Sequence, residues 1–230
     1  MNFIEEGIKQ GAGLIFSLDS EVFSIVKLSL FVCVIATLIA VFIGVPLGAL
    51  IAVKKFPLKK LLITLINTGM GLPPVVVGLV VCLFLFRNGP LGALGWLYTV
   101  KGMILAQVII ALPIITGLTL AALQGMETKV YRQILSLGAN QIQALYLMVR
   151  EARLSIAAAV IAGFGSVISE VGAVMMVGGN IKGQTRVLTT DIVLQTQIGN
   201  FALAIALGLI LLVLSFLVNL ALTFIQQHRA

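Results

Sequence analysis

Residues 130–156 read VYRQILSLGANQIQALYLMVREARLSI and differ sharply from the chain around them. The stretch carries three arginines, a glutamate and several amides, whereas 60% of the 230-residue chain is hydrophobic and 10% is charged. Gly138 lies near its middle, where a tight turn between two helices is expected. Apolar residues recur at helical spacing and predict one amphipathic face: Ile134, Leu137, Ile142, Leu145, Met148 and Val149.

The rest of the chain has the composition of a membrane protein. Its mean hydropathy is +1.17, and a soluble domain of this size would carry about a quarter charged residues. The net charge of +7 is interpreted as topology-setting charge at the membrane edges rather than as a nucleic-acid surface. Cys33 and Cys82 fall inside apolar runs and are expected to be small core residues, not a disulfide or a metal pair.

Five apolar runs are long enough to cross a bilayer, which takes about 20 residues of helix. We therefore expect an all-α polytopic membrane protein, with residues 1–230 forming one transmembrane domain and a polar loop at 127–153. No signal peptide is recognised, so the first run is expected to stay as an anchor. The predicted spans are 22–53, 61–86, 102–124, 154–177 and 201–225.

The distribution of lysine and arginine between the loops predicts the orientation. With the N-terminus outside, the inside loops hold nine of these residues: Lys54, Lys55, Lys59, Lys60, Lys129, Arg132, Arg150, Arg153 and Arg229. The outside then holds six: Lys9, Lys27, Arg87, Lys101, Lys182 and Arg186. We therefore expect the N-terminus outside, and the C-terminus and the polar stretch in the cytoplasm.

Prolines interrupt two of the predicted spans. Pro73 and Pro74 lie in GLPPVVVGLVV, and Pro113 lies in IIALPIITG. Each removes a helical hydrogen bond and bends its span. Bent backbone at membrane depth is tolerated where it is packed in protein or lines a cavity. Two interpretations stay open: a packing kink, or a helix bent around a translocation path.

Glu170 is an ionisable residue deep inside a predicted span. A charge at that depth costs about 2.5–3.5 kcal/mol on insertion scales, so the side chain must face protein or water, or be protonated. We expect it to serve a structural or gating hydrogen bond, in a network with Ser166 and Ser169, ahead of direct contact with substrate. For Gln107 the expected role is helix–helix hydrogen bonding.

The sequence contains no recognisable catalytic or nucleotide-binding motif. GGNIKGQT places Gly178 and Gly183 at P-loop spacing, but Gln184 follows where a P-loop needs lysine. The single histidine, His228, lies in the C-terminal tail. We therefore expect neither an enzyme nor a cofactor in this chain, and uphill transport would need a partner that supplies energy.

The polar stretch resembles the EAA loop of the permease subunits of binding-protein-dependent ABC importers. That pattern is Glu-Ala-Ala, three residues, glycine, nine residues, then Ile-x-Leu-Pro. Here Gly138 is the glycine, Arg132, Gln133 and Ile134 replace Glu-Ala-Ala, and Met148, Arg150 and Glu151 replace Ile, Leu and Pro. The loop nevertheless precedes the penultimate span, as in that family.

A longer resemblance covers most of the chain. Four stretches are together similar to the tungstate-type branch of the molybdate/tungstate/sulfate permeases. They are GLPPVVVGLVVCLFLFRNGPLG, SLGANQIQALYLMVREAR, AAVIAGFGSVISEVGAVMMVGGNI and TRVLTTDIVLQTQIGNFALAIALG. The resemblance implies a type I ABC importer fold in a prokaryotic cell membrane. It also implies three kinds of protein partner: a second copy of the chain, an ATPase dimer that binds ATP and Mg²⁺, and an extracytoplasmic binding protein that delivers the oxyanion.

The same resemblance implies roles for individual residues. The ATPase-coupling residues would be Tyr131, Ile134, Leu137, Gly138, Ala139, Ile142, Leu145 and Tyr146. The bent backbone and the polar residues inside the spans, rather than the resemblance, supply the candidates for the pathway or its gate, which are Pro73, Pro74, Pro113, Ser169 and Glu170. In the outer loop, Lys182 and Arg186 could attract a dianion, meet acidic residues of the binding protein, or simply be solvated.

Several functional alternatives remain at this point. Tungstate is expected from the resemblance, but molybdate and sulfate are tetrahedral dianions too. A self-sufficient secondary transporter would need inverted repeats and coupling-ion residues, which five spans and one buried glutamate do not supply. A membrane scaffold would explain the polar stretch but not the bent, glycine-rich spans.

Overall fold

The computed structural model describes residues 5, 9, 13, 20–126 and 128–227. Arg229 and His228 lie outside the described residues, as do the side chains of Lys129 and Arg132. Within the described part the chain is helical, without strands. The elements are α2 (Ser20–Val53), α3 (Lys59–Met70), α4 (Pro74–Leu85), η1 (Gly92–Leu94), α5 (Val100–Gln124), α6 (Thr128–Ser136), α7 (Gln141–Glu151), α8 (Arg153–Ile168), α9 (Gly172–Gly178), α10 (Leu188–Gln197) and α11 (Phe201–Gln227).

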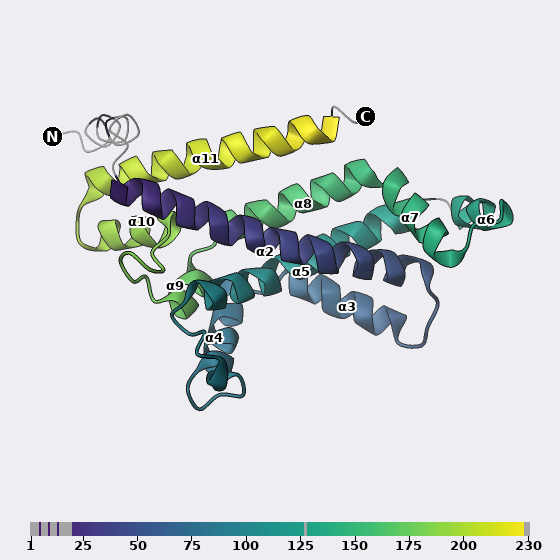
Figure 1. Ribbon diagram of the computed structural model, residues 1–230, viewed down its shortest axis with the longest axis horizontal. Coiled ribbons are helices and arrows are strands. Elements are labelled where there is room, and N and C mark those ends of the chain that lie inside the picture. Colours follow the sequence, from purple (N-terminus) through teal and green to yellow (C-terminus); the bar gives the residue numbers. More distant parts are fainter. Residues whose placement is uncertain (1–4, 6–8, 10–12, 14–19, 127, 228–230) are drawn as a thin grey trace.

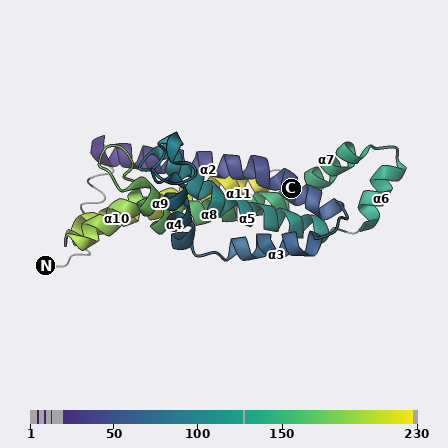
Figure 2. The same cartoon turned by 90° about the horizontal axis from the view of Figure 1, so that it is seen from below.

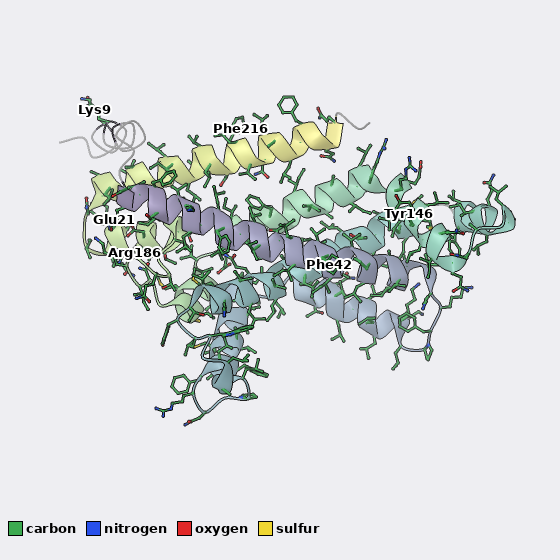
Figure 3. All side chains as sticks on the ribbon, in the orientation of Figure 1. Lys9, Glu21, Phe42, Tyr146, Arg186 and Phe216 are labelled. Carbon is green, nitrogen blue, oxygen red and sulfur yellow. The ribbon has the colours of Figure 1, made fainter. Side chains whose placement is uncertain are left out.

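Three helices, α2, α5 and α11, are each long and apolar enough to cross a membrane. Two bent pairs, α3 with α4 and α7 with α8, bring the number of spans to as many as five. The all-α fold with about five spans is therefore confirmed. Large apolar side chains remain exposed along these helices, as a bilayer requires, and Figure 3 shows Phe216 of α11 pointing away from the bundle.

The long helices α2, α5, α8 and α11 run along one another, with α3 beside α5 (Figure 1). Small residues bring α2 and α5 close together: a Cβ on Gly48 would lie 2.7 Å from the carbonyl oxygen of Thr116. Cys33 lies in the core cluster that α2, α5 and α8 share, and neither it nor Cys82 forms a disulfide. The close helix contacts explain why glycine and alanine are frequent in these spans.

The predicted span 61–86 is bent at its prolines, as expected, and the bend divides it into two helices. The first helix ends at Met70, and α4 begins at Pro74 after a bend of 102°. Proline at the first helical position lacks the N–H that would be unpaired there, and it disfavours helical backbone in the residue before it. Figures 1 and 2 show α4 leaving the direction of the long helices. Pro113, by contrast, lies inside α5, which continues through it.

The predicted span 154–177 is also interrupted. It divides into α8, which ends at Ile168, and the short α9, which begins at Gly172. The outer loop expected after it contains a further helix, α10, with Thr189, Thr190 and Asp191 buried. Sequence periodicity missed α10 because its polar residues face the protein interior rather than water.

The two ends of the bundle differ in character. The helices α6 and α7 lie at one end, together with the turn between α2 and α3, and the start of α2 and α10 lie at the other (Figures 1 and 2). We refer to residues 128–151 as the elbow and to these two ends as the elbow end and the α10 end. Figure 3 accordingly shows Tyr146 at the elbow end, with Glu21 and Arg186 at the α10 end.

Candidate coupling surface and translocation pathway

The turn of the elbow is built from local backbone chemistry. Gly138 has a φ of +90° and its N–H donates to the carbonyl of Leu135 at 3.0 Å. Asn140 then caps α7: its Oδ1 accepts from the N–H of Gln143 at 2.8 Å, and the Oε1 of Gln143 accepts from the N–H of Asn140 at 2.9 Å. This reciprocal pair is a capping box, and the sequence carries its signal as Asn-x-x-Gln at residues 140–143.

One face of the elbow packs against the bundle. Ala144 and Met148 are buried in a cluster that includes Ala49 of α2, Leu123 of α5 and Ile156 of α8. Three of the predicted coupling residues pack against the same cluster and are partly buried, namely Tyr131, Ile134 and Leu145. These residues attach the elbow to the spans.

The opposite face of the elbow is apolar and exposed. Leu137 is 82% exposed, Ile142 79% and Tyr146 65%. A hollow of about 480 Å³ on this face is lined by Ala139, Ile142, Gln143, Tyr146 and Leu147. The prediction of a single amphipathic face is therefore wrong, because Leu137 and Ile142 point away from the bundle while Leu145 and Met148 point into it.

The helix breaks at 71–73 and 169–171 lie near one another. A Cβ on Gly172, the first residue of α9, would lie 2.7 Å from the Cγ2 of Val75 in α4. Farther along the same contact, a Cβ on Gly78 would lie 2.5 Å from the Cα of Ala173. Both breaks are thus held by close packing between α4 and α9.

Glu170 lies in the second break and is 8% exposed. Its Oε1 accepts a hydrogen bond from the N–H of Ala173 at 2.8 Å, and its carbonyl oxygen accepts one from Thr189 Oγ1 at 3.0 Å. The residue therefore connects α9 to α10. Ser169 does not join this network: its hydroxyl donates to the carbonyls of Gly165 and Ser166 in α8.

Gln107 connects α5 to α8, as expected. Its Nε2 donates to the carbonyl of Val167, with a donor–acceptor distance of 3.4 Å. Gln107, Ser29 and Thr189 help to line a cavity of only about 10 Å³ between α2, α5, α8 and α10. This cavity is too small to hold an oxyanion.

Lys182 and Arg186, the outer-loop candidates at the α10 end, both form ion pairs. Lys182 Nζ lies 2.7 Å from Glu21 Oε1, and Arg186 Nη1 lies 3.8 Å from Asp191 Oδ1. Asp191 is buried and its Oδ1 also accepts from Gln195 Nε2 at 3.0 Å. These carboxylates reduce the attraction that the two cations exert on an approaching dianion.

This helical arrangement is that of a type I ABC importer permease. A chain of the MetNI methionine ABC transporter, solved in inward-facing conformations, matches it with a TM-score of 0.73 and 17% identity, over 95% of this chain and 98% of that one. The chain belongs to the family described as binding-protein-dependent transport system inner membrane component, which it matches over residues 44–230. The family resemblance inferred from the sequence is confirmed.

Several relatives are similar over most of the chain. The tungstate uptake system permease protein TupB of Peptoclostridium acidaminophilum is 41% identical over 228 residues, which is 99% of this chain and 100% of the relative. TupB of Campylobacter jejuni is 36% identical over 95% of this chain and 92% of the relative. The sulfate transport system permease protein CysW of Escherichia coli is 28% identical over 86% of this chain and 72% of the relative.

Proposed function

We propose that this chain forms the membrane path of an ABC importer for tungstate. The observation that carries the proposal is the 41% identity with a tungstate uptake permease along the whole of both chains. Similarity to sulfate and molybdenum permeases is lower, at 28% for CysW of Escherichia coli and for YvgM of Bacillus subtilis. Molybdate and sulfate are therefore the alternatives that an experiment must separate.

Partner ATPases would drive this transport from the elbow end. The exposed apolar side chains of Leu137, Ile142 and Tyr146 suit insertion into a groove, because burying such anchors is what stabilises an interface core. ATP and Mg²⁺ would bind to the ATPases, and this chain would act without a cofactor or a catalytic residue. Alternating access would then arise because ATP and the loaded binding protein change the relative stability of the inward-facing and outward-facing states.

The α10 end would receive the binding protein outside a prokaryotic cell membrane. The excess of lysine and arginine in the predicted inside loops, nine against six by the count above, supports an outside N-terminus and a cytoplasmic elbow. A second copy of the chain would complete the path. The small cavity between α2, α5, α8 and α10 is in keeping with a path between protomers rather than within one.

The test is ATP hydrolysis by the chain reconstituted with its ATPase and binding protein. The binding protein is supplied empty, or loaded with tungstate, molybdate or sulfate. Stimulation by the tungstate-loaded form above the others supports the proposal, and a different ranking would reassign the anion. Anion uptake that persists without ATPase would instead support a secondary transporter.

A further inference from the structure

The helix α3 carries a polar face that no role assigned above explains. Five of its residues follow one another at spacings of four, three, one and three positions, and they therefore lie on one side of the helix: Lys60, Thr64, Asn67, Thr68 and Gly71. All five are exposed. The opposite side packs on α5, where a Cβ on Gly117 would contact Met70 and Ile66.

The polar face extends from the elbow end to the middle of the bundle. At its start, Lys59 Nζ donates to the carbonyls of Ala52 and Lys54, both at 3.0 Å, and so closes the end of α2. At its finish, a Cβ on Gly69 would lie 2.9 Å from Pro113, near the centre of α5. Because α5 is long enough to cross the membrane, the face reaches to about half the depth of the bilayer.

Lipid is a poor environment for this face. Among the described residues, the side chains of Asn67 and Thr68 have no hydrogen-bond partner, and Thr64 donates only to the carbonyl of Lys60 in its own helix. Polar groups at membrane depth are found facing protein or a water-filled cavity. The irregular backbone of residues 71–73, directly beyond Met70, has the same requirement.

The charges of the surrounding sequence suit an anion. From Val22 to Met126 the sequence contains no aspartate or glutamate, and its cations are Lys27, Lys54, Lys55, Lys59, Lys60, Arg87 and Lys101. Threonine hydroxyls and an asparagine amide are neutral donors, which bind an oxyanion without holding it as tightly as an arginine would. The carboxylate of Glu170, in the second helix break, accepts the N–H of Ala173.

We propose that Lys60, Thr64, Asn67 and Thr68 of α3 line the elbow-side half of the path taken by a tetrahedral oxyanion. Lys60 lies at the mouth, where its ammonium attracts the dianion toward the exit. The three neutral side chains replace part of its hydration shell along the way. The inference rests on the proposed function, since it assumes that an anion crosses this chain.

The first test is the accessibility of introduced cysteines in the full transporter, with ATPase and binding protein, in lipid nanodiscs. A membrane-impermeant thiosulfonate reagent that carries a negatively charged sulfonate group is applied to three variants: Thr64→Cys, Asn67→Cys and Thr68→Cys. Peptide mapping distinguishes labelling of these cysteines from labelling of Cys33 and Cys82. Leu62→Cys is the matched control, because six residues along a helix place it about 120° away from Thr68. We expect the polar-face cysteines to react at least about tenfold faster than Leu62→Cys, because only an aqueous site yields thiolate.

Comparing a negatively charged reagent with a positively charged one makes the test specific for an anion path. A polar-face cysteine should react faster with the sulfonate reagent than with its trimethylammonium counterpart, relative to the same ratio for a small free thiol. Asn67→Asp, nearly equal in shape, should lower tungstate uptake at least about tenfold through repulsion of the dianion, whereas Asn67→Ser, which keeps a neutral donor, should lower it less.

Three results would overturn the inference. Protection of all three cysteines would place the face against lipid or against the second copy of the chain. Labelling without preference for the anionic reagent, or unchanged uptake in Asn67→Asp, would show a wet surface that is not the anion path. Tungstate-stimulated ATP hydrolysis by the unmodified complex is measured in parallel: if it is present, these failures concern α3 alone, and if it is absent, the proposed function itself fails.

Discussion

The elbow and the paired helix breaks are both interruptions of helix, but different forces hold them. At the elbow, the positive φ of Gly138 and the capping box of Asn140 and Gln143 lie within a few residues of one another. At the breaks, residues almost a hundred positions apart, Gly78 and Ala173, touch. An element held by its own backbone can change its surroundings and keep its shape, as a part that transmits force must. A junction held by packing changes only when its helices move.

The first prediction concerns the packed junction between α4 and α9. Gly78→Val would place a Cβ 2.5 Å from the Cα of Ala173, and backbone cannot yield as a flexible side chain does. Overpacking of this kind costs about 1–3 kcal/mol or more. We expect a clear fall in the melting temperature of the purified permease. Gly208→Val in α11, where nothing lies within 4 Å, is the control, and equal melting temperatures would disprove close packing of α4 on α9.

The second prediction separates the two faces of the elbow. Met148→Ala removes a buried side chain from the contact with the bundle and should cost about 2–5 kcal/mol of stability. Tyr146→Ala changes an exposed side chain and should leave stability within about 0.5 kcal/mol while weakening association with the ATPase. Thermal unfolding and co-purification measure the two effects. A stable Met148→Ala or an undiminished complex in Tyr146→Ala would contradict the assignment of the faces.

Sequence information predicted these regions unequally, for physical reasons. Gly138 and its flanking helices are local features, so their pattern was sufficient to place the elbow, although not to tell its inner face from its outer one. Pro73 and Pro74 marked the position of the first break. The bend of 102° depends on how α4 packs on α9, and no periodicity records that contact.

The α10 end was the least predictable part. Helix α10 is stabilised by distant partners: the N–H of Leu188 donates to Ser29 Oγ, and Thr189 donates to the carbonyl of Glu170. The sequence does not indicate the partners of Lys182 and Arg186, because Glu21 is far from Lys182 along the chain and Asp191 lies in a helix that periodicity does not predict. Their pairing required the fold.

The third prediction sharpens the account of the second break. Glu170→Gln keeps an oxygen that accepts the N–H of Ala173, whereas Glu170→Leu leaves that buried N–H unpaired at a cost of about 1–3 kcal/mol. We expect the glutamine variant to retain most stability and transport, and the leucine variant to lose both in part. Melting temperature and tungstate uptake are the measurements. Equal losses in the two variants would indicate that the charge itself is required.

The fourth prediction concerns the turn of the elbow, where a small change in stability should have a large effect on coupling. No atom lies within 4 Å of a Cβ on Gly138, so Gly138→Val introduces no clash, but its φ of +90° is strongly disfavoured for a β-branched residue. The strain, of about 1–2 kcal/mol, is relieved by opening the turn, while Met148 and Ala144 keep α7 attached to the bundle. We therefore expect a nearly unchanged melting temperature with a loss of ATP hydrolysis stimulated by loaded binding protein.

Gly138→Asn is the control, because asparagine tolerates positive φ better and should preserve coupling. If the valine variant couples normally, the elbow does not transmit force through the shape of this turn, and the contrast with the packed breaks loses its functional meaning.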